Sequence, residues 1–120
     1  MQDFRKLMIW QKGHEMVLEI YTMTNNYPRT ETYGLVSQMR RSAASIPTNI
    51  AEGCGRYGNK ELARFVQIAL GSASELEYQI LLSRDLGYIV PNQHDVVMEK
   101  MTLLKKMIVK FLAGLRKRIN

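Results

Sequence analysis

Apolar residues recur three and four positions apart in four separate stretches of the chain, which is the spacing of one face of an α-helix. Glycine, proline and asparagine interrupt this pattern between the stretches, as they do in turns. No stretch shows the alternation of apolar and polar residues that is typical of a β-strand. The pattern predicts four helices, over about residues 8–25, 31–53 and 59–87 and after the turn at 87–92.

Long helices with short connections favour an all-α fold, an up-down-up-down antiparallel four-helix bundle that forms a single domain over residues 1–120. The last helix has a heptad seam. Asn59 is expected to be the N-cap of the third helix, and Gly87 to follow its last turn. The positions expected in the core share helical spacing: Ile9, Met16, Ile20 and Met23; Leu35, Met39, Ala43, Ile46 and Ile50; Leu62, Phe65, Val66, Ala69, Ala73, Leu76 and Ile80; Val97, Met101, Leu104, Ile108, Phe111 and Leu115.

The second predicted helix contains a proline, Pro47, far from its ends. Inside a helix, proline removes one backbone donor and its ring clashes with the carbonyl four residues earlier, here that of Ala43, at about 3 kcal/mol. We therefore expect this helix to be kinked at Pro47.

The first predicted helix has a wider apolar face than one neighbouring helix can cover. Trp10, Val17 and Tyr21 form a second stripe beside its core positions. The extra surface predicts self-association. The alternative is that this helix is the most buried one of a monomer.

Charge is distributed unevenly along the chain. The net charge is +6, and residues 92–120 contribute seven Lys and Arg against two acids, a net +5. Lys106, Lys110 and Lys117 lie opposite the heptad seam, where a basic surface favours an anionic partner such as RNA or DNA. The helix dipole explains why these bases stand near the helix end, but it does not explain their excess. Few aromatic residues interleave the lysines, so we expect backbone contacts rather than base stacking.

Candidate catalytic and metal-binding residues are sparse. Residues 53–58 match G-x-G-x-x-G, but no strand precedes them, so we interpret the glycines as a corner that needs positive φ. His14 and His94 lack the spacing of metal ligands, and Cys54 has no histidine nearby. We expect no enzyme activity, no metal and no cofactor. A phosphate held by Arg56 and the first backbone N–H groups of the third helix remains an alternative.

A polar ridge runs along the second predicted helix beside its core face. Its members are spaced three or four apart: Gln38, Arg41, Ser45, Asn49, Glu52 and Arg56. Short side chains such as Ser45 and Asn49 are poor helix formers but let another backbone approach closely. The ridge is either a solvated face or an interface. As candidate oligomer or partner contacts we take Gln38, Arg41, Ser45, Asn49 and Glu52, together with Trp10.

The compartment can be inferred from three features of the sequence. A single cysteine cannot form an internal disulfide, and no apolar run is long enough to span a bilayer. The first residues also lack the apolar stretch of a signal peptide. We expect a cytoplasmic protein without a membrane partner.

The whole chain resembles the four-helix-bundle proteins encoded within intervening sequences of bacterial 23S ribosomal RNA genes. The accessory variability proteins of diversity-generating retroelements look like relatives. The motifs that carry the resemblance are Leu7-x-Ile9-Trp10-Gln11-Lys12, Tyr21, Tyr27-Pro28-x-x-Glu31-x-Tyr33-Gly34-Leu35, the string QMRRSAASIPTNIAEG over residues 38–53, and Phe65-x-x-Ile68-Ala69-x-Gly71-Ser72-x-x-Glu75-Leu76-Glu77.

The resemblance implies a homopentameric ring with a basic surface and a non-catalytic, nucleic-acid-associated role. In the retroelement relatives that role is to bind the reverse transcriptase and its RNA. One hypothesis is therefore an oligomer that binds RNA or DNA through its backbone. Candidate contacts for this are Arg40, Arg41, Arg56, Lys106, Lys110, Arg116 and Lys117. The other is a protein-interaction scaffold or accessory subunit that binds a partner protein and no nucleic acid.

Overall fold

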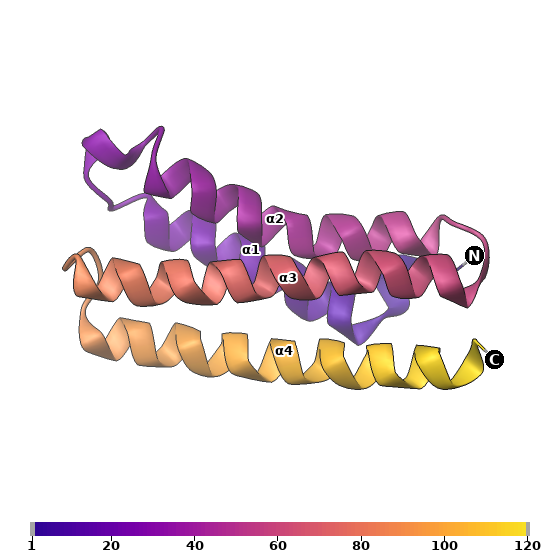
Figure 1. The fold of residues 1–120 in the computed structure, drawn as a ribbon. Helices are drawn as coiled ribbons and strands as arrows, with labels where there is room; N and C mark the ends of the chain where they lie inside the picture. The colour runs from indigo at the N-terminus through magenta and orange to yellow at the C-terminus, as the bar shows by residue number, and fades with distance from the viewer. Residues whose placement is uncertain (1, 120) are drawn as a thin grey trace.

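Four long antiparallel helices make up the protein (Figure 1). The computed structural model describes residues 2–119, which form a bundle of 47 × 24 × 20 Å. Two short 3-10 helices, η1 and η2, precede the first and second long helices. The bounds are η1 Phe4–Lys6, α1 Met8–Thr24, η2 Arg29–Glu31, α2 Leu35–Cys54, α3 Gly58–Asp85 and α4 Pro91–Arg118. The predicted fold class is confirmed.

The helices pack in a ring in which each one contacts the next along the chain. α1 contacts α2, α2 contacts α3, α3 contacts α4, and α4 returns to α1. Among residues 2–119 the diagonal pairs, α1 with α3 and α2 with α4, make no close backbone approach. α2 packs most extensively on α3, whereas the α1–α4 contact is the smallest of the four. The sides of α1 and α4 that face each other are therefore the least covered by other helices within one protomer.

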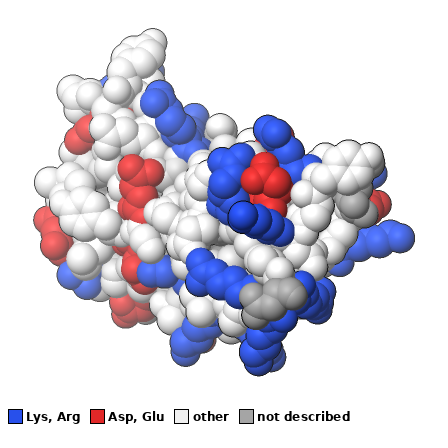
Figure 2. Space-filling view, turned by 45° about the vertical axis from the view of Figure 1, so that its right-hand side comes forward, with Lys and Arg blue, Asp and Glu red and all other residues white. Residues whose placement is uncertain are grey.

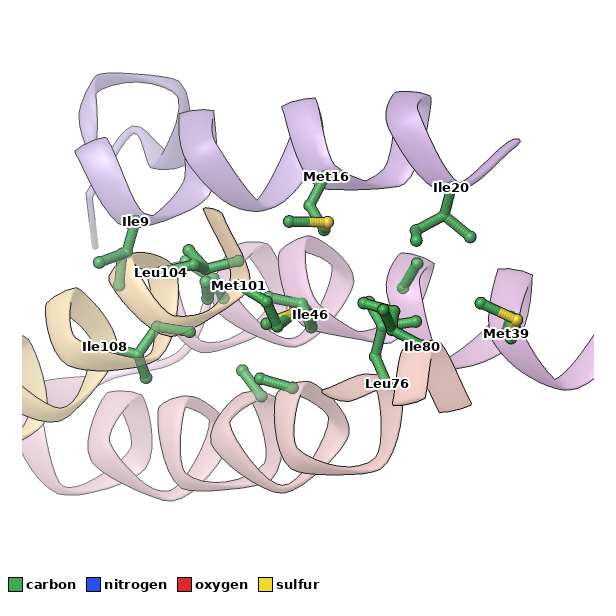
Figure 3. Packing of buried hydrophobic residues seen from close by; sticks show 14 of the residues in the cluster. Ile9, Met16, Ile20, Met39, Ile46, Leu76, Ile80, Met101, Leu104 and Ile108 are labelled. Carbon is green, nitrogen blue, oxygen red and sulfur yellow. The ribbon is translucent and has the colours of Figure 1, made fainter. Parts of the chain in front are cut away.

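The core lies along the axis of the bundle (Figure 3). The predicted inward positions are buried, with one exception in α4: Phe111 is half-buried and Leu112 is buried in its place. A straight α-helix has 3.6 residues per turn and drifts relative to a strict heptad, which moves the buried position by one residue near the end of a long helix. No described helix combines the length and hydropathy needed to cross a membrane.

α1 is not the most buried helix, so burial within one protomer does not account for its wide apolar face, and self-association stays a prediction. Six of its 17 residues are buried, against ten of 20 in α2. Within the second stripe, Trp10 and Val17 are half-buried and Tyr21 is exposed. This surface remains accessible in the protomer.

Pro47 lies inside α2, which continues through it and changes direction partway along its length (Figure 1). The proline is buried, and it lies next to Gly13 of α1. A Cβ atom on Gly13 would lie 3.2 Å from Ile46 Cγ2 and 3.7 Å from Pro47 Cδ. The missing side chain thus lets α1 pass close to the bent part of α2.

The predicted start of the third helix is wrong. The N-cap of α3 is Tyr57 rather than Asn59, because the chain turns at Gly58, whose φ is +81°. Gly55 has an ordinary helical φ of −82°, so the expectation of positive φ fails there. Gly87, with φ of +79°, does follow the last turn of α3 as predicted.

The second helix begins at Leu35 rather than near residue 31, and Glu31 stabilises its start. One carboxylate oxygen accepts the Leu35 backbone N–H at 3.2 Å, and the other accepts the Tyr88 hydroxyl at 2.7 Å. Glu31 therefore joins the α1–α2 connection to the α3–α4 connection. The hydrogen bond from Tyr88, followed by that from Leu35, lowers the pKa of Glu31.

This geometry predicts how stability depends on pH. Because the pKa of Glu31 is lowered in the folded state, its contribution is present above the unfolded-state pKa of about 4.3 and is lost as the pH falls through the folded-state pKa. Glu31→Gln is expected to unfold at lower urea concentration at pH 7, and its stability should fall less steeply below about pH 4.3. Urea titrations followed by circular dichroism check this; parallel pH profiles of the two proteins would contradict it.

Candidate nucleic-acid interface

One end of the bundle brings together three segments that are far apart in the sequence. The backbone N–H of Gln2 donates to the carbonyl of Cys54 at 3.2 Å, which ties the N-terminal segment to the end of α2. Arg116 Nη2 donates to Gln67 Oε1 at 2.6 Å, which ties the end of α4 to the first turns of α3. The N-terminal segment that begins at Gln2 and the last turns of α4 therefore lie at the same end of the bundle as the α2–α3 corner (Figure 1).

This end, here called the basic end, carries most of the net charge. We define it by its charged residues: Asp3, Arg5, Lys6, Glu52, Arg56, Lys60, Glu61, Arg64, Arg116, Lys117 and Arg118. Eight bases face three acids there, a net +5 of the chain's +6. Figure 2 shows Lys and Arg gathered on this side, whereas Asp and Glu are more frequent on the left of the view.

The three acids of the basic end are each paired with an arginine. Asp3 pairs with Arg5 at 3.1 Å, Glu52 with Arg56 at 3.1 Å, and Glu61 with Arg64 at 3.0 Å. The hydrogen bond from Arg64 lowers the pKa of Glu61, and that from Arg5 lowers the pKa of Asp3. Five bases have no carboxylate within 4 Å in the described part of the chain: Lys6, Lys60, Arg116, Lys117 and Arg118.

Two of the three paired arginines, Arg56 and Arg64, lie over the same ring, that of Phe65, while Arg5 lies over Phe4 at 5.4 Å. The guanidinium carbon of Arg64 lies 4.4 Å from the centroid of the Phe65 ring, and that of Arg56 lies 5.2 Å from it. Cation–π attraction and the two ion pairs together fix both guanidinium groups at the α2–α3 corner. Arg56, predicted from the sequence, is therefore positioned within the basic end.

The predicted lysines of α4 extend this surface along the bundle. Lys117 belongs to the basic end, Lys110 lies about two turns earlier, and Lys106 lies about one turn before Lys110. All three side chains are exposed. Lys105, by contrast, pairs with Glu77 of α3 at 3.0 Å and joins the two helices.

The structure separates Arg40 and Arg41 from the other candidates. Arg40 is half-buried and donates to Thr24 Oγ1 at 3.0 Å, Asn25 Oδ1 at 3.0 Å and the Tyr21 carbonyl at 3.3 Å. Its contacts give it a structural role at the end of α1. Arg41 is exposed on α2, diagonally across the bundle from α4. The α4 lysines and Arg41 therefore do not form one continuous surface.

Part of the polar ridge contacts α3 within the same chain. The hydroxyl groups of Ser45 and Ser72 lie 2.8 Å apart, and Asn49 Nδ2 donates to the Ser45 carbonyl at 2.8 Å. Ser45 thus serves the close packing of α2 on α3, whereas the hydrogen bonds of Asn49 stay within α2, and the place of both in an interface stays a prediction. Gln38, Arg41 and Glu52 remain exposed, and their place in an interface stays a prediction.

Trp10 and Glu52 line the same shallow groove between α1 and α2. The Trp10 ring stacks on His14, with centroids 5.1 Å apart, and meets Phe4 edge-on at 4.9 Å. The groove floor is formed by small residues around Pro47. The structure therefore brings together two candidate interface residues that lie far apart in the sequence.

Comparison with known proteins adds the family. The sequence model described as 23S rRNA-intervening sequence protein matches residues 5–110, most of the chain. The chain belongs to this family. A crystal structure from the S23 ribosomal protein family of Bacteroides thetaiotaomicron, of a protein with unknown function, has the same fold. The two share a TM-score of 0.77 and 24% identity over 87% of this chain and 97% of that one. No curated protein matches the chain.

The structure shows the surroundings of the cysteine and of the two histidines. Burial raises the pKa of the Cys54 thiol, which disfavours the nucleophilic thiolate. His94 is buried with Nδ1 2.9 Å from Asp95, whereas His14 is exposed beneath Trp10. Within residues 2–119 no three His, Cys, Asp or Glu side chains are grouped so that they could hold a metal ion.

Proposed function

We propose that this family member is a non-catalytic protein that binds RNA by contacting the sugar–phosphate backbone with its basic end. The net +5 gathered there supports the proposal most directly. Lys and Arg that neutralise phosphates release condensed counterions, which supplies most of the affinity in sequence-independent binding. DNA offers the same phosphates; RNA is chosen because the retroelement proteins that the chain resembles have a role that includes binding RNA.

The unpaired bases of the basic end are the groups that suit this role. Lys60 and Lys117 have no carboxylate within 4 Å among the described residues, so a phosphate need not displace an existing ion pair. The paired arginines of the basic end keep Asp3, Glu52 and Glu61 from acting as isolated repelling charges. Phosphate contacts at exposed bases of this kind position a nucleic acid without reading its sequence.

Reversing the charge of two unpaired lysines at the basic end tests the proposal. We expect Lys60→Glu combined with Lys117→Glu to weaken binding of a labelled RNA hairpin at least about tenfold and to reduce the log–log salt slope by about two. Fluorescence anisotropy between about 50 and 200 mM salt measures both quantities. Circular dichroism confirms that the variant is folded.

A matched control reverses two bases at the opposite end. Arg29→Glu combined with Arg84→Glu changes the net charge equally but should leave the affinity within about threefold. An equal loss in both pairs would contradict a site at the basic end. Absence of hairpin binding by the unaltered protein at about 50 mM salt would contradict RNA binding itself.

In the same proposal the protein assembles with itself, and the resemblance to its family implies a homopentamer. Uncovered apolar side chains between α1 and α4 support assembly: Leu18, Val96 and Leu103 are each more than half exposed. Light scattering tests this, because a mass near five protomers would support the ring and a monomer would contradict it.

The same apolar side chains favour a second candidate function, that of a scaffold which binds a partner protein through α1. Salt separates the two functions, since an apolar interface responds weakly to ionic strength and backbone binding responds strongly. A pentamer whose mass is unchanged by RNA at low salt would favour the scaffold.

A further inference from the structure

The side chain of Tyr57 projects into solvent from the α2–α3 corner at the basic end. It is 87% exposed, although tyrosine usually packs its ring against other apolar atoms. The corner positions it: Gly55 ends α2, and Gly58 turns the chain into α3 with φ of +81°. Tyr57 itself has an extended backbone, with φ of −87° and ψ of 130°.

Both faces of the Tyr57 ring are open. In the described part of the chain it has neither an aromatic partner nor a cation over its ring. The two nearby guanidinium groups, of Arg56 and Arg64, are directed to Phe65 instead. Trp10, Tyr21 and Tyr27, in contrast, each contact another ring or a guanidinium. An open ring among fixed positive charges is the arrangement by which proteins stack an unpaired base while holding its phosphates.

We propose that Tyr57 is a stacking platform for an unpaired base, so that the basic end prefers single-stranded RNA or an RNA loop over a duplex. This inference rests on the proposed RNA binding and adds the kind of RNA. Lys60, three residues further along the chain and with no carboxylate within 4 Å among the described residues, is the base best suited to contact a phosphate beside the stacked base. Bases in a duplex already stack on their neighbours and cannot use the ring, whereas bases in a loop can.

The chain contains a matched control for this residue. Tyr33 is 96% exposed, but it lies at the opposite end of α2, near Arg29 and Glu31, where charges are balanced. An exposed tyrosine that only contributes to solubility or non-specific adhesion would behave the same way at either end. The two alanine variants therefore separate a stacking site from mere exposure.

The test uses the full chain with two labelled probes, an oligouridylate of about twelve nucleotides and an RNA duplex of the same length. We expect Tyr57→Ala to weaken binding of the oligouridylate about fivefold to a hundredfold and to leave duplex binding within about twofold. Tyr57→Trp should bind the oligouridylate as tightly as the unaltered protein or more tightly. Tyr33→Ala should change neither affinity.

The outcomes separate the inference from the function on which it rests. Unchanged oligouridylate affinity in Tyr57→Ala, or equal losses for both probes, would overturn the stacking platform while leaving RNA binding in place. Equal losses in Tyr57→Ala and Tyr33→Ala would overturn it as well. If the unaltered protein binds neither probe at low salt, the proposed function itself fails.

Discussion

Arg40→Ala is expected to lower the free energy of unfolding by about 2–3 kcal/mol and to leave RNA affinity unchanged. The Arg40 guanidinium reaches the last turn of α1, where it donates to the Tyr21 carbonyl, to Thr24 Oγ1 and to Asn25 Oδ1. Tyr21 is among the last four residues of α1, and its carbonyl, which also accepts the Thr24 hydroxyl at 3.3 Å, gains a second donor from Arg40. A cation at a helix C-terminus also interacts favourably with the helix dipole.

Urea denaturation of three variants checks this prediction. Arg41→Ala is the matched control, because Arg41 is the next residue and is exposed, and we expect a change below about 0.5 kcal/mol. Arg40→Lys should recover little of the loss, since one ammonium group cannot bond all three oxygens in this planar arrangement. If Arg40→Ala were as stable as the unaltered protein but bound RNA less tightly, the structural role would be wrong and the predicted RNA contact would be supported.

Gly53→Val is expected to lower the free energy of unfolding by about 3 kcal/mol. A Cβ atom at this buried position would lie 2.9 Å from Leu62 Cδ1, 2.9 Å from Phe65 Cβ and 3.4 Å from Leu62 Cα. The last contact is with the backbone of α3, so the two helices would have to separate. Because Phe65 also holds Arg56 and Arg64, we expect the variant to bind RNA less tightly than its remaining folded fraction alone would explain.

The same substitution elsewhere supplies the control. Gly71 lies exposed in α3, with nothing within 4 Å of a Cβ atom added there. Gly71→Val should change stability by only a few tenths of a kcal/mol, in the stabilising direction, because valine has a higher helix propensity than glycine. Similar midpoints of thermal or urea unfolding for the two variants would show that the close approach of α2 to α3 at Gly53 does not contribute to stability.

The four long helices and their buried faces could be predicted from the spacing of apolar residues, because a repeat of 3.6 residues is a local property of the chain. The seam from Val97 to Ile108 and the glycine at 87 were predicted correctly for this reason. The start of α3 was not, because Asn59 is a good N-cap by residue type while Gly58 turns the chain one position earlier. Close approaches such as Gly13 to Pro47 depend on pairs of helices and leave no periodic signal.

The candidate site was predicted in part. The sequence showed the excess of bases in residues 92–120, but the basic end also draws on Arg5, Lys6 and the α2–α3 corner, which only the fold brings together. For the same reason the pattern around the α4 lysines gave no sign of a stacking residue, whereas in the structure Tyr57 directly precedes α3 at the basic end and is exposed. RNA contact by any of these side chains stays a prediction, as does the relation to retroelement accessory proteins.

The uneven charge also affects how the molecule meets a polyanion. Five of its six excess positive charges lie at one end of a body 47 Å long, so the protein has a permanent electric dipole directed along the bundle axis. The field of a nucleic acid would turn such a body before contact, and it would arrive end first. An end-first approach leaves the long sides, with their exposed apolar side chains on α1 and α4, free to contact neighbouring copies that point the same way.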